Sequence, residues 1–219
     1  MKPFIQFSAL FITFCTSSVA FAHHPLGALQ METFIHGFLS GIGHPILGID
    51  HLFFVIIVGI TAFLIGHRIW AAASYIIAMV VGCAAMSFGI DFPVKELMIA
   101  LSLLLVGGMV LSGRVLELIP TLGIFALFGL FHGSAFGNSL AEQESSSGVP
   151  VLIGYLLGLS LIQFFISFLA GTVISNFALE NGMTSIRVRF SGAMVAGTGL
   201  FLTLQMIESS LFNAMGWGH

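Results

Sequence analysis

Six long apolar segments with almost no charge inside them restrict the fold more than any other feature of the chain. They cover residues 48–66, 69–89, 94–112, 115–137, 150–178 and 190–212. Each is close to the ~20 residues that an α-helix needs to cross a bilayer. We therefore predict an all-α, polytopic integral membrane helical bundle of about six spans.

Composition excludes the soluble alternatives. Only 7% of the residues are charged, whereas a soluble domain carries about 25% charged residues. The charged groups cannot cover the surface of a soluble enzyme of this length. The Lys and Arg residues number six and are scattered along the chain, which excludes a nucleic-acid partner. The lipid bilayer is the expected surrounding, and the sequence specifies no oligomeric state.

The first 22 residues have the pattern of a secretory signal peptide. Lys2 is followed by an apolar run from Phe4 to Phe14, and Ala20 and Ala22 form a small-x-small cleavage site. We predict cleavage after Ala22, with residues 23–219 forming a single transmembrane domain. An uncleaved signal anchor is the alternative.

Cleavage would place two histidines at a new N-terminus. A terminal amine beside the imidazoles of His23 and His24 can chelate a divalent metal, and a tail without function is the alternative. Cleavage would also remove Cys15 and leave Cys83 as the sole cysteine, which excludes an internal disulfide.

Basic residues predict the orientation of the bundle. Arg68, Arg114 and the pair Arg187 and Arg189 fall in alternate loops, which are therefore expected on the cytoplasmic side. The acidic loop 138–148 then lies outside, as do the mature N-terminus and the C-terminus. The predicted location is a bacterial-type inner (plasma) membrane.

The stretch 29–46 differs from the six apolar segments. Its spacing is helical, but it contains Glu32, His36 and His44 together with several glycines. We expect a short re-entrant or interfacial helix over the outer mouth, because irregular backbone at membrane depth must pack on protein or line a cavity.

The densest polar motif is the segment from His44 to His51. Asp50 and His51 are expected in the first turn of a membrane helix, and Pro45 and Gly48 are expected to break the chain and turn His44 towards His51. One carboxylate and two imidazoles suit Ni(II), Co(II) or Zn(II). Alternatively, Asp50 orients His51 from outside the coordination shell, or it caps the helix beside a structural histidine.

A second histidine motif ends the segment 115–137. His132 is followed by small residues at 133, 134, 135 and 137, which also favour close helix packing. The predicted orientation places His132 on the same side of the bilayer as His51. We therefore expect both motifs to contribute to one site.

Other polar groups give weaker signals. Ser160, Gln163, Gln205 and Glu208 lie within apolar segments, where they either extend a polar path or form hydrogen bonds between helices. The sequence HGxxxG occurs at His36 and again at His132, as a weak internal repeat.

One helix face carries soft ligands. Met79, Cys83 and Met86 follow i, i+4, i+7 spacing, and their sulfur atoms suit Cu(I). The alternative is ordinary packing.

These motifs resemble those of the HupE/UreJ family of hydrogenase and urease accessory membrane proteins. The resemblance covers the signal peptide, HPxxGxDH at His44 to His51, the glycine-rich body and HGxA at His132 to Ala135. It implies a nickel or cobalt permease, with a metal role for His44, Asp50, His51 and His132 and a supporting role for His36. The second motif of the family often continues with another histidine, where this chain has Phe136.

The leading interpretation is therefore a secondary transporter of a divalent metal, without enzymatic activity and without a permanent cofactor. Nickel or cobalt is the expected cargo, and copper and zinc are the alternatives. His23, His24 and Glu208 are weaker candidate ligands. A copper transporter using Met and Cys ligands, or an intramembrane zinc hydrolase with Asp50 or Glu208 as base, are the alternative functions.

Overall fold

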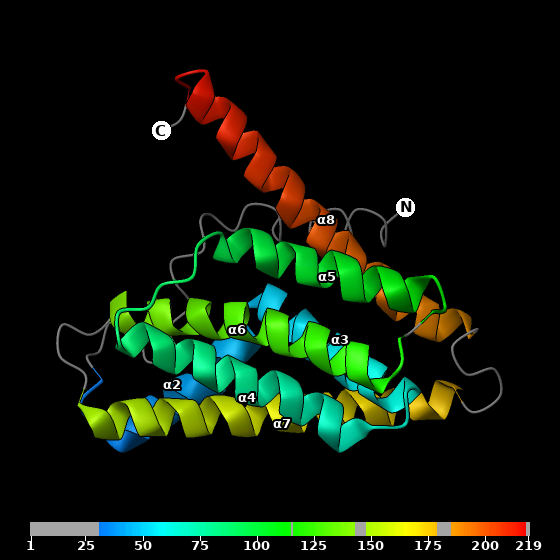
Figure 1. Ribbon diagram of the computed structural model, residues 1–219, viewed down its shortest axis with the longest axis horizontal. Coiled ribbons are helices and arrows are strands. Elements are labelled where there is room, and N and C mark those ends of the chain that lie inside the picture. The colour runs from blue at the N-terminus through cyan, green and yellow to red at the C-terminus, as the bar shows by residue number, and fades with distance from the viewer. Residues whose placement is uncertain (1–30, 115, 143–147, 179–184, 218–219) are drawn as a thin grey trace, which may run out of the picture.

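The computed structural model describes residues 31–114, 116–142, 148–178 and 185–217 (Figure 1). These residues form seven helices and no strand, which confirms the all-α prediction. The helices are α2 (Phe34–Leu47), α3 (Ile49–Leu64), α4 (Arg68–Ser87), α5 (Lys95–Leu111), α6 (Leu118–Glu142), α7 (Val149–Ala178) and α8 (Ile186–Ala214). Each of the six predicted apolar segments coincides with one of the helices α3 to α8. The predicted signal peptide, His23 and His24 lie outside the described residues.

Helix length and hydropathy identify a multi-pass membrane protein. Among the described residues, α4, α6, α7 and α8 are long and apolar enough to cross a bilayer, and the bent pair α2 and α3 brings the number to five if it forms one span. Helix α5 has 17 residues, slightly fewer than the ~20 of a typical span. The predicted number of six spans is therefore not confirmed.

The chain bends by 83° between α2 and α3. Gly48 is extended (φ −82°, ψ 103°) and both ends α2 and begins α3. The predicted break therefore falls at Gly48, while α2 continues through Pro45 to Leu47.

Helices α2 and α3 both contact α7, at successive positions along it. Gly37 of α2 meets the backbone of Val151, and Gly59 of α3 meets the backbone of Ser167, which lies further along α7. A broken span and a re-entrant loop both fit the bend by length and composition. The contacts place α2 along α7 and bring α3 to α7 around Gly59.

Glycines bring the helices together in pairs. A Cβ atom at Gly37 or Gly41 would collide with the backbone of α7, and one at Gly133 would collide with the backbone of α4. Gly107 of α5 is similarly close to the backbone of α8. Small residues at such contacts are typical of membrane helices, which associate through close backbone packing. Figure 1 shows α4 beside α6, and α8 crossing α5 before its C-terminal half projects from the bundle.

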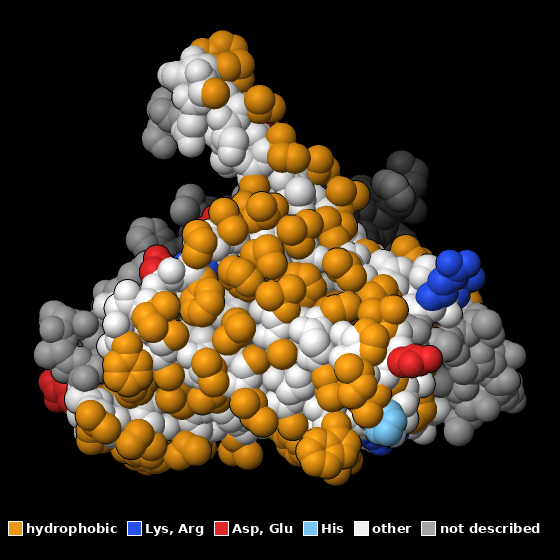
Figure 2. Space-filling view, in the orientation of Figure 1, with side chains coloured by type: hydrophobic (Ala, Val, Ile, Leu, Met, Phe, Trp, Pro, Cys, Tyr) orange, Lys and Arg blue, Asp and Glu red, His pale blue; other side chains and the backbone are white. Residues whose placement is uncertain are grey.

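The outer surface is largely apolar. Side chains such as Trp70, Ile77 and Phe165 are at least 60% exposed, and hydrophobic atoms cover most of the face in Figure 2. An apolar surface of this extent would aggregate in water and fits a lipid environment. Polar groups inside this bundle therefore lie in a medium where an unpaired group is costly.

Candidate functional site

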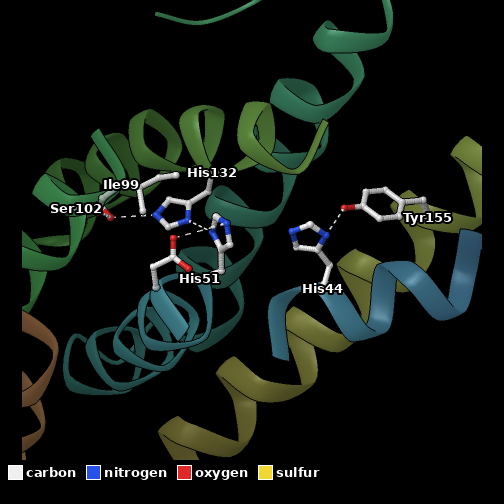
Figure 3. A network of polar contacts seen from close by, with 7 residues as sticks. His44, His51, Ile99, Ser102, His132 and Tyr155 are labelled. Carbon is white, nitrogen blue, oxygen red and sulfur yellow. Dashed lines mark hydrogen bonds and ion pairs between the residues drawn. The ribbon is translucent and has the colours of Figure 1, made fainter. Parts of the chain in front are cut away.

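Two histidines from distant parts of the chain meet inside the bundle. His51 lies in the first turn of α3 and His132 lies in α6, with exposed fractions of 7% and 0%. Their Nδ1 atoms are 2.8 Å apart and form a hydrogen bond (Figure 3). The structure thus brings together the two histidine motifs, as the sequence predicts.

A serine on α5 determines which nitrogens carry protons. Ser102 Oγ donates to the carbonyl of Ile99 at 2.6 Å and lies 3.0 Å from His132 Nε2. Because a hydroxyl has one proton, Ser102 accepts a hydrogen bond from His132 Nε2–H. In a neutral His132, Nδ1 is then the acceptor for His51 Nδ1–H.

In a neutral His51, this hydrogen-bond chain leaves the lone pair of Nε2 for another partner. That nitrogen lies 3.9 Å from Asp50 Oδ2. A neutral imidazole nitrogen beside a carboxylate oxygen is a ligand combination that divalent transition metals accept. Both nitrogens of His132 are hydrogen-bonded, one to His51 and one to Ser102.

His44 lies next to this pair but has different contacts. Its ring centroid is 6.1 Å from that of His51, and its Nδ1 is 3.3 Å from the hydroxyl of Tyr155. Tyr155 also donates to the carbonyl of Phe136 at 3.3 Å. The α7 tyrosine therefore links His44 on α2 to the α6 backbone one turn after His132.

Phe136 occupies the position of the missing second histidine. Its ring centroid is 4.2 Å from His51 and 5.1 Å from His44. The side chain is fully buried. An apolar ring thus takes the place beside both histidines where a further nitrogen ligand would lie.

Asp50 opens the site to a cavity between α3, α5 and α8. Its side chain is 32% exposed. The cavity has a volume of about 430 Å³ and is lined by Asp50, Glu96, Ile99, Leu202, Gln205, Met206, Ser209, Ser210 and Asn213. Two carboxylates with no basic side chain in this lining favour a cation in the cavity.

The remaining candidate ligands lie elsewhere. His36 is at the start of α2, two turns before His44, and its Nδ1 accepts from the backbone N–H of Glu32 at 3.3 Å. Glu208 is exposed on α8 and does not line the cavity. In the part of the chain that the structure describes, no group of three or more His, Cys, Asp or Glu side chains is close enough to hold a metal ion.

The sulfur-bearing face of α4 packs against α6. Gly133 meets the backbone of Met79, and Gly137 meets the Met86 side chain and the backbone of Cys83. Cys83 is a buried free thiol. These contacts support the packing interpretation of the three residues.

Sequence reasoning missed Ser102, Tyr155 and Glu96. Ser102 and Tyr155 stand alone in apolar segments, and Glu96 lies at the start of one beside Lys95. Their roles depend on contacts across 30 or more positions, such as Ser102 with His132.

Comparison with known proteins identifies the family. The HupE / UreJ protein family matches residues 11–202. The chain belongs to the HupE/UreJ family. It is similar to Protein HupE of Rhizobium leguminosarum bv. viciae, with 29% identity over 181 residues, covering 82% of this chain and 83% of the relative. No solved structure matches the chain.

Proposed function

We propose that this HupE/UreJ protein is a secondary transporter that carries a divalent transition metal, nickel or cobalt, across the inner membrane for hydrogenase or urease maturation. The family is associated with these accessory roles and with nickel or cobalt uptake. The observation that carries the proposal is His51 Nε2, left as an acceptor beside Asp50 at a helix break. Broken membrane helices are frequent ion-binding elements in transporters.

Capture would begin in the cavity between α3, α5 and α8. Asp50 and Glu96 give its lining two negative charges, and such charges raise the local concentration of cations. The ion would then exchange part of its water shell for Asp50 Oδ2 and His51 Nε2. His132 and Ser102 keep the His51 ring in the required orientation.

His44 would supply the third protein ligand. It lies in the last turn of α2, before the break at Gly48, and its ring centroid is 6.1 Å from that of His51. A small rotation at Gly48 would bring the two imidazoles to one ion, because the residue lacks the side chain that restricts such a movement. Binding would thus be coupled to a change in the angle between α2 and α3. This change would release the ion inward.

The experiment offers Ni²⁺, Co²⁺, Zn²⁺ and Cu²⁺ together to cells with and without the protein and measures cell metal content by mass spectrometry. We expect nickel or cobalt to accumulate, and His51→Ala to remove at least 90% of that accumulation, an approximately tenfold effect typical of disturbed metal sites. His67→Ala is the matched control, because His67 follows the opposite end of α3. Accumulation that is absent, or unchanged in His51→Ala, would reject the proposal.

A further inference from the structure

Gln163 is the buried polar side chain that the site described above does not use. It lies in α7, is 0% exposed, and has no hydrogen-bond partner at either Oε1 or Nε2. The helix–helix hydrogen bond that the sequence suggests for it is therefore not formed. Leaving both groups of an amide unpaired in an apolar interior costs about 1–3 kcal/mol or more.

The other unpartnered groups near the site are of a different kind. Ser40, Thr61, Ser134 and Tyr75 also have unpaired hydroxyls. A serine or threonine in a helix can turn its hydroxyl to a carbonyl of its own helix, and Tyr75 leaves a single hydroxyl unpaired. The amide of glutamine has two donors and a carbonyl oxygen, and it needs partners from outside its own turn. Among the described residues, Gln163 is therefore the buried side chain with the most unpaired donors and acceptors.

Gln163 lies on a buried face of α7 that runs from the His44 contact to a small, mostly apolar cavity. Tyr155, Leu159, Gln163, Ser167 and Gly171 recur every four residues and form one buried face of the helix. Tyr155 contacts His44 at one end of this face. Ser167 and Gly171 line a small cavity with Arg68 at the other end.

Its neighbours locate Gln163 relative to the break. Leu159, one turn before it, packs against Gly41 of α2, and Ser167, one turn after it, packs against Gly59 of α3. Gln163 is thus between the points where α7 leaves α2 and meets α3. It lies two turns, or about 12 Å at 1.5 Å per residue, beyond Tyr155 along the helix.

We propose that the amide oxygen of Gln163 is a transient ligand for the divalent cation after it leaves the Asp50 and His51 site. This inference rests on the proposed transport function and adds a second site to it. A neutral oxygen binds a transition metal more weakly than an imidazole does. Weak intermediate sites suit conduction, since an ion must be able to leave each site that it occupies.

The cavity beyond Gln163 is small, with a volume of about 10 Å³, and offers a cation no acidic ligand. Arg68 contributes a positive charge to its lining, and no acidic residue lines it. A cation that reaches Ser167 would be repelled by Arg68 rather than held. The sequence of sites is therefore strong binding at His51, weak binding at Gln163 and release near Arg68.

The test separates binding from transport in the full-length protein. Gln163→Met keeps the length of the side chain and removes its polar atoms, so it should not lower the melting temperature. We expect the initial rate of Ni²⁺ uptake into proteoliposomes to fall at least tenfold, while equilibrium binding of Ni²⁺ to the purified protein stays within twofold. Ser160→Ala is the matched control on α7, because its hydroxyl bonds to the carbonyl of Leu156 in the same helix.

Each outcome decides the inference. Wild-type uptake in Gln163→Met would overturn it and leave the proposed transport function intact. Loss of Ni²⁺ binding together with uptake would also overturn it, because Gln163 would then support the first site. No Ni²⁺ transport by the wild-type protein would reject both proposals. If Gln163→Met does not accumulate, Gln163→Glu keeps an oxygen ligand, and we expect the half-saturating Ni²⁺ concentration for uptake to change at least threefold; no change would overturn the inference.

Discussion

The two HGxxxG segments of this protein have the same helix-packing geometry and different surroundings. Gly37 and Gly41 of α2 pack on the backbone of α7, and Gly133 and Gly137 of α6 pack on the backbone of α4. The histidines that begin the two segments nevertheless differ in burial and in hydrogen bonding. His132 is fully buried and hydrogen-bonded at both nitrogens, whereas His36 is half-buried and contacts the backbone of Glu32.

In this motif, the glycines and the histidine have separate roles. The glycines determine which helices approach each other, because only a residue without a side chain permits this contact. The function of the histidine depends on further helices. His132 meets His51 of α3 and Ser102 of α5, while His36 precedes the segment of α2 that the rest of the bundle covers.

The largest expected effect comes from breaking both helix pairs. Gly37→Leu and Gly133→Leu each place a side chain on the backbone of the partner helix, so we expect both variants to lose most of their accumulation in the membrane. The measurement is the folded yield after detergent extraction, by size-exclusion chromatography. Gly123→Leu in α6 is the control, because a Cβ atom there meets nothing within 4 Å. Normal yield of one glycine variant would show that the two pairs are not equivalent.

The histidines themselves should then respond differently. We expect His132→Ala to weaken Ni²⁺ binding about 10–100-fold, as residues that orient metal ligands usually do. His36→Ala should change binding less than twofold. Equilibrium dialysis of the two purified variants against Ni²⁺ measures this difference. Equal losses would mean that His36 approaches the site in a conformation other than the one described.

The sequence predicts the parts of the site that depend on neighbours along the chain. The break before Asp50 follows from the properties of Gly48, and the meeting of His51 with His132 follows from helix orientation. The grouping of His36 with the ligands stays a prediction, and the structure places it two turns of α2 before His44. No local pattern distinguishes Ser102 from other serines in apolar helices, and its role arises only where α5 meets α6.

Ser102 provides a smaller test of why His132 differs from His36. Ser102→Ala removes the acceptor of His132 Nε2–H and leaves both histidines in place. We expect Ni²⁺ binding to weaken by about tenfold, at the lower end of the range for such partners. Ser112→Ala is the control, because that hydroxyl is exposed and bonds to Met109 of its own helix. Unchanged binding in Ser102→Ala would contradict the assigned pattern of protons.

The smallest effect is expected where the two segments differ in the residue before the second glycine. This position holds Ser40 in α2 and Phe136 in α6. Phe136→His would place an imidazole beside His51 and His44, whose ring centroids lie 4.2 Å and 5.1 Å from that of Phe136. An added nitrogen ligand should tighten Ni²⁺ binding, offset in part by the burial of a polar ring in an apolar pocket.

We expect a net gain of about threefold to tenfold in affinity for Ni²⁺, corresponding to about 0.7–1.4 kcal/mol. Calorimetric titration of the purified variant measures it. Ser40→His is the matched variant in α2, where the site described here gives no reason for a gain. If Phe136→His binds Ni²⁺ no better than the wild type, Phe136 is a packing residue and the site does not extend to it. If it binds better, the Phe136 ring is what limits the protein ligands to Asp50, His51 and His44. His132 then contacts His51 without binding the ion.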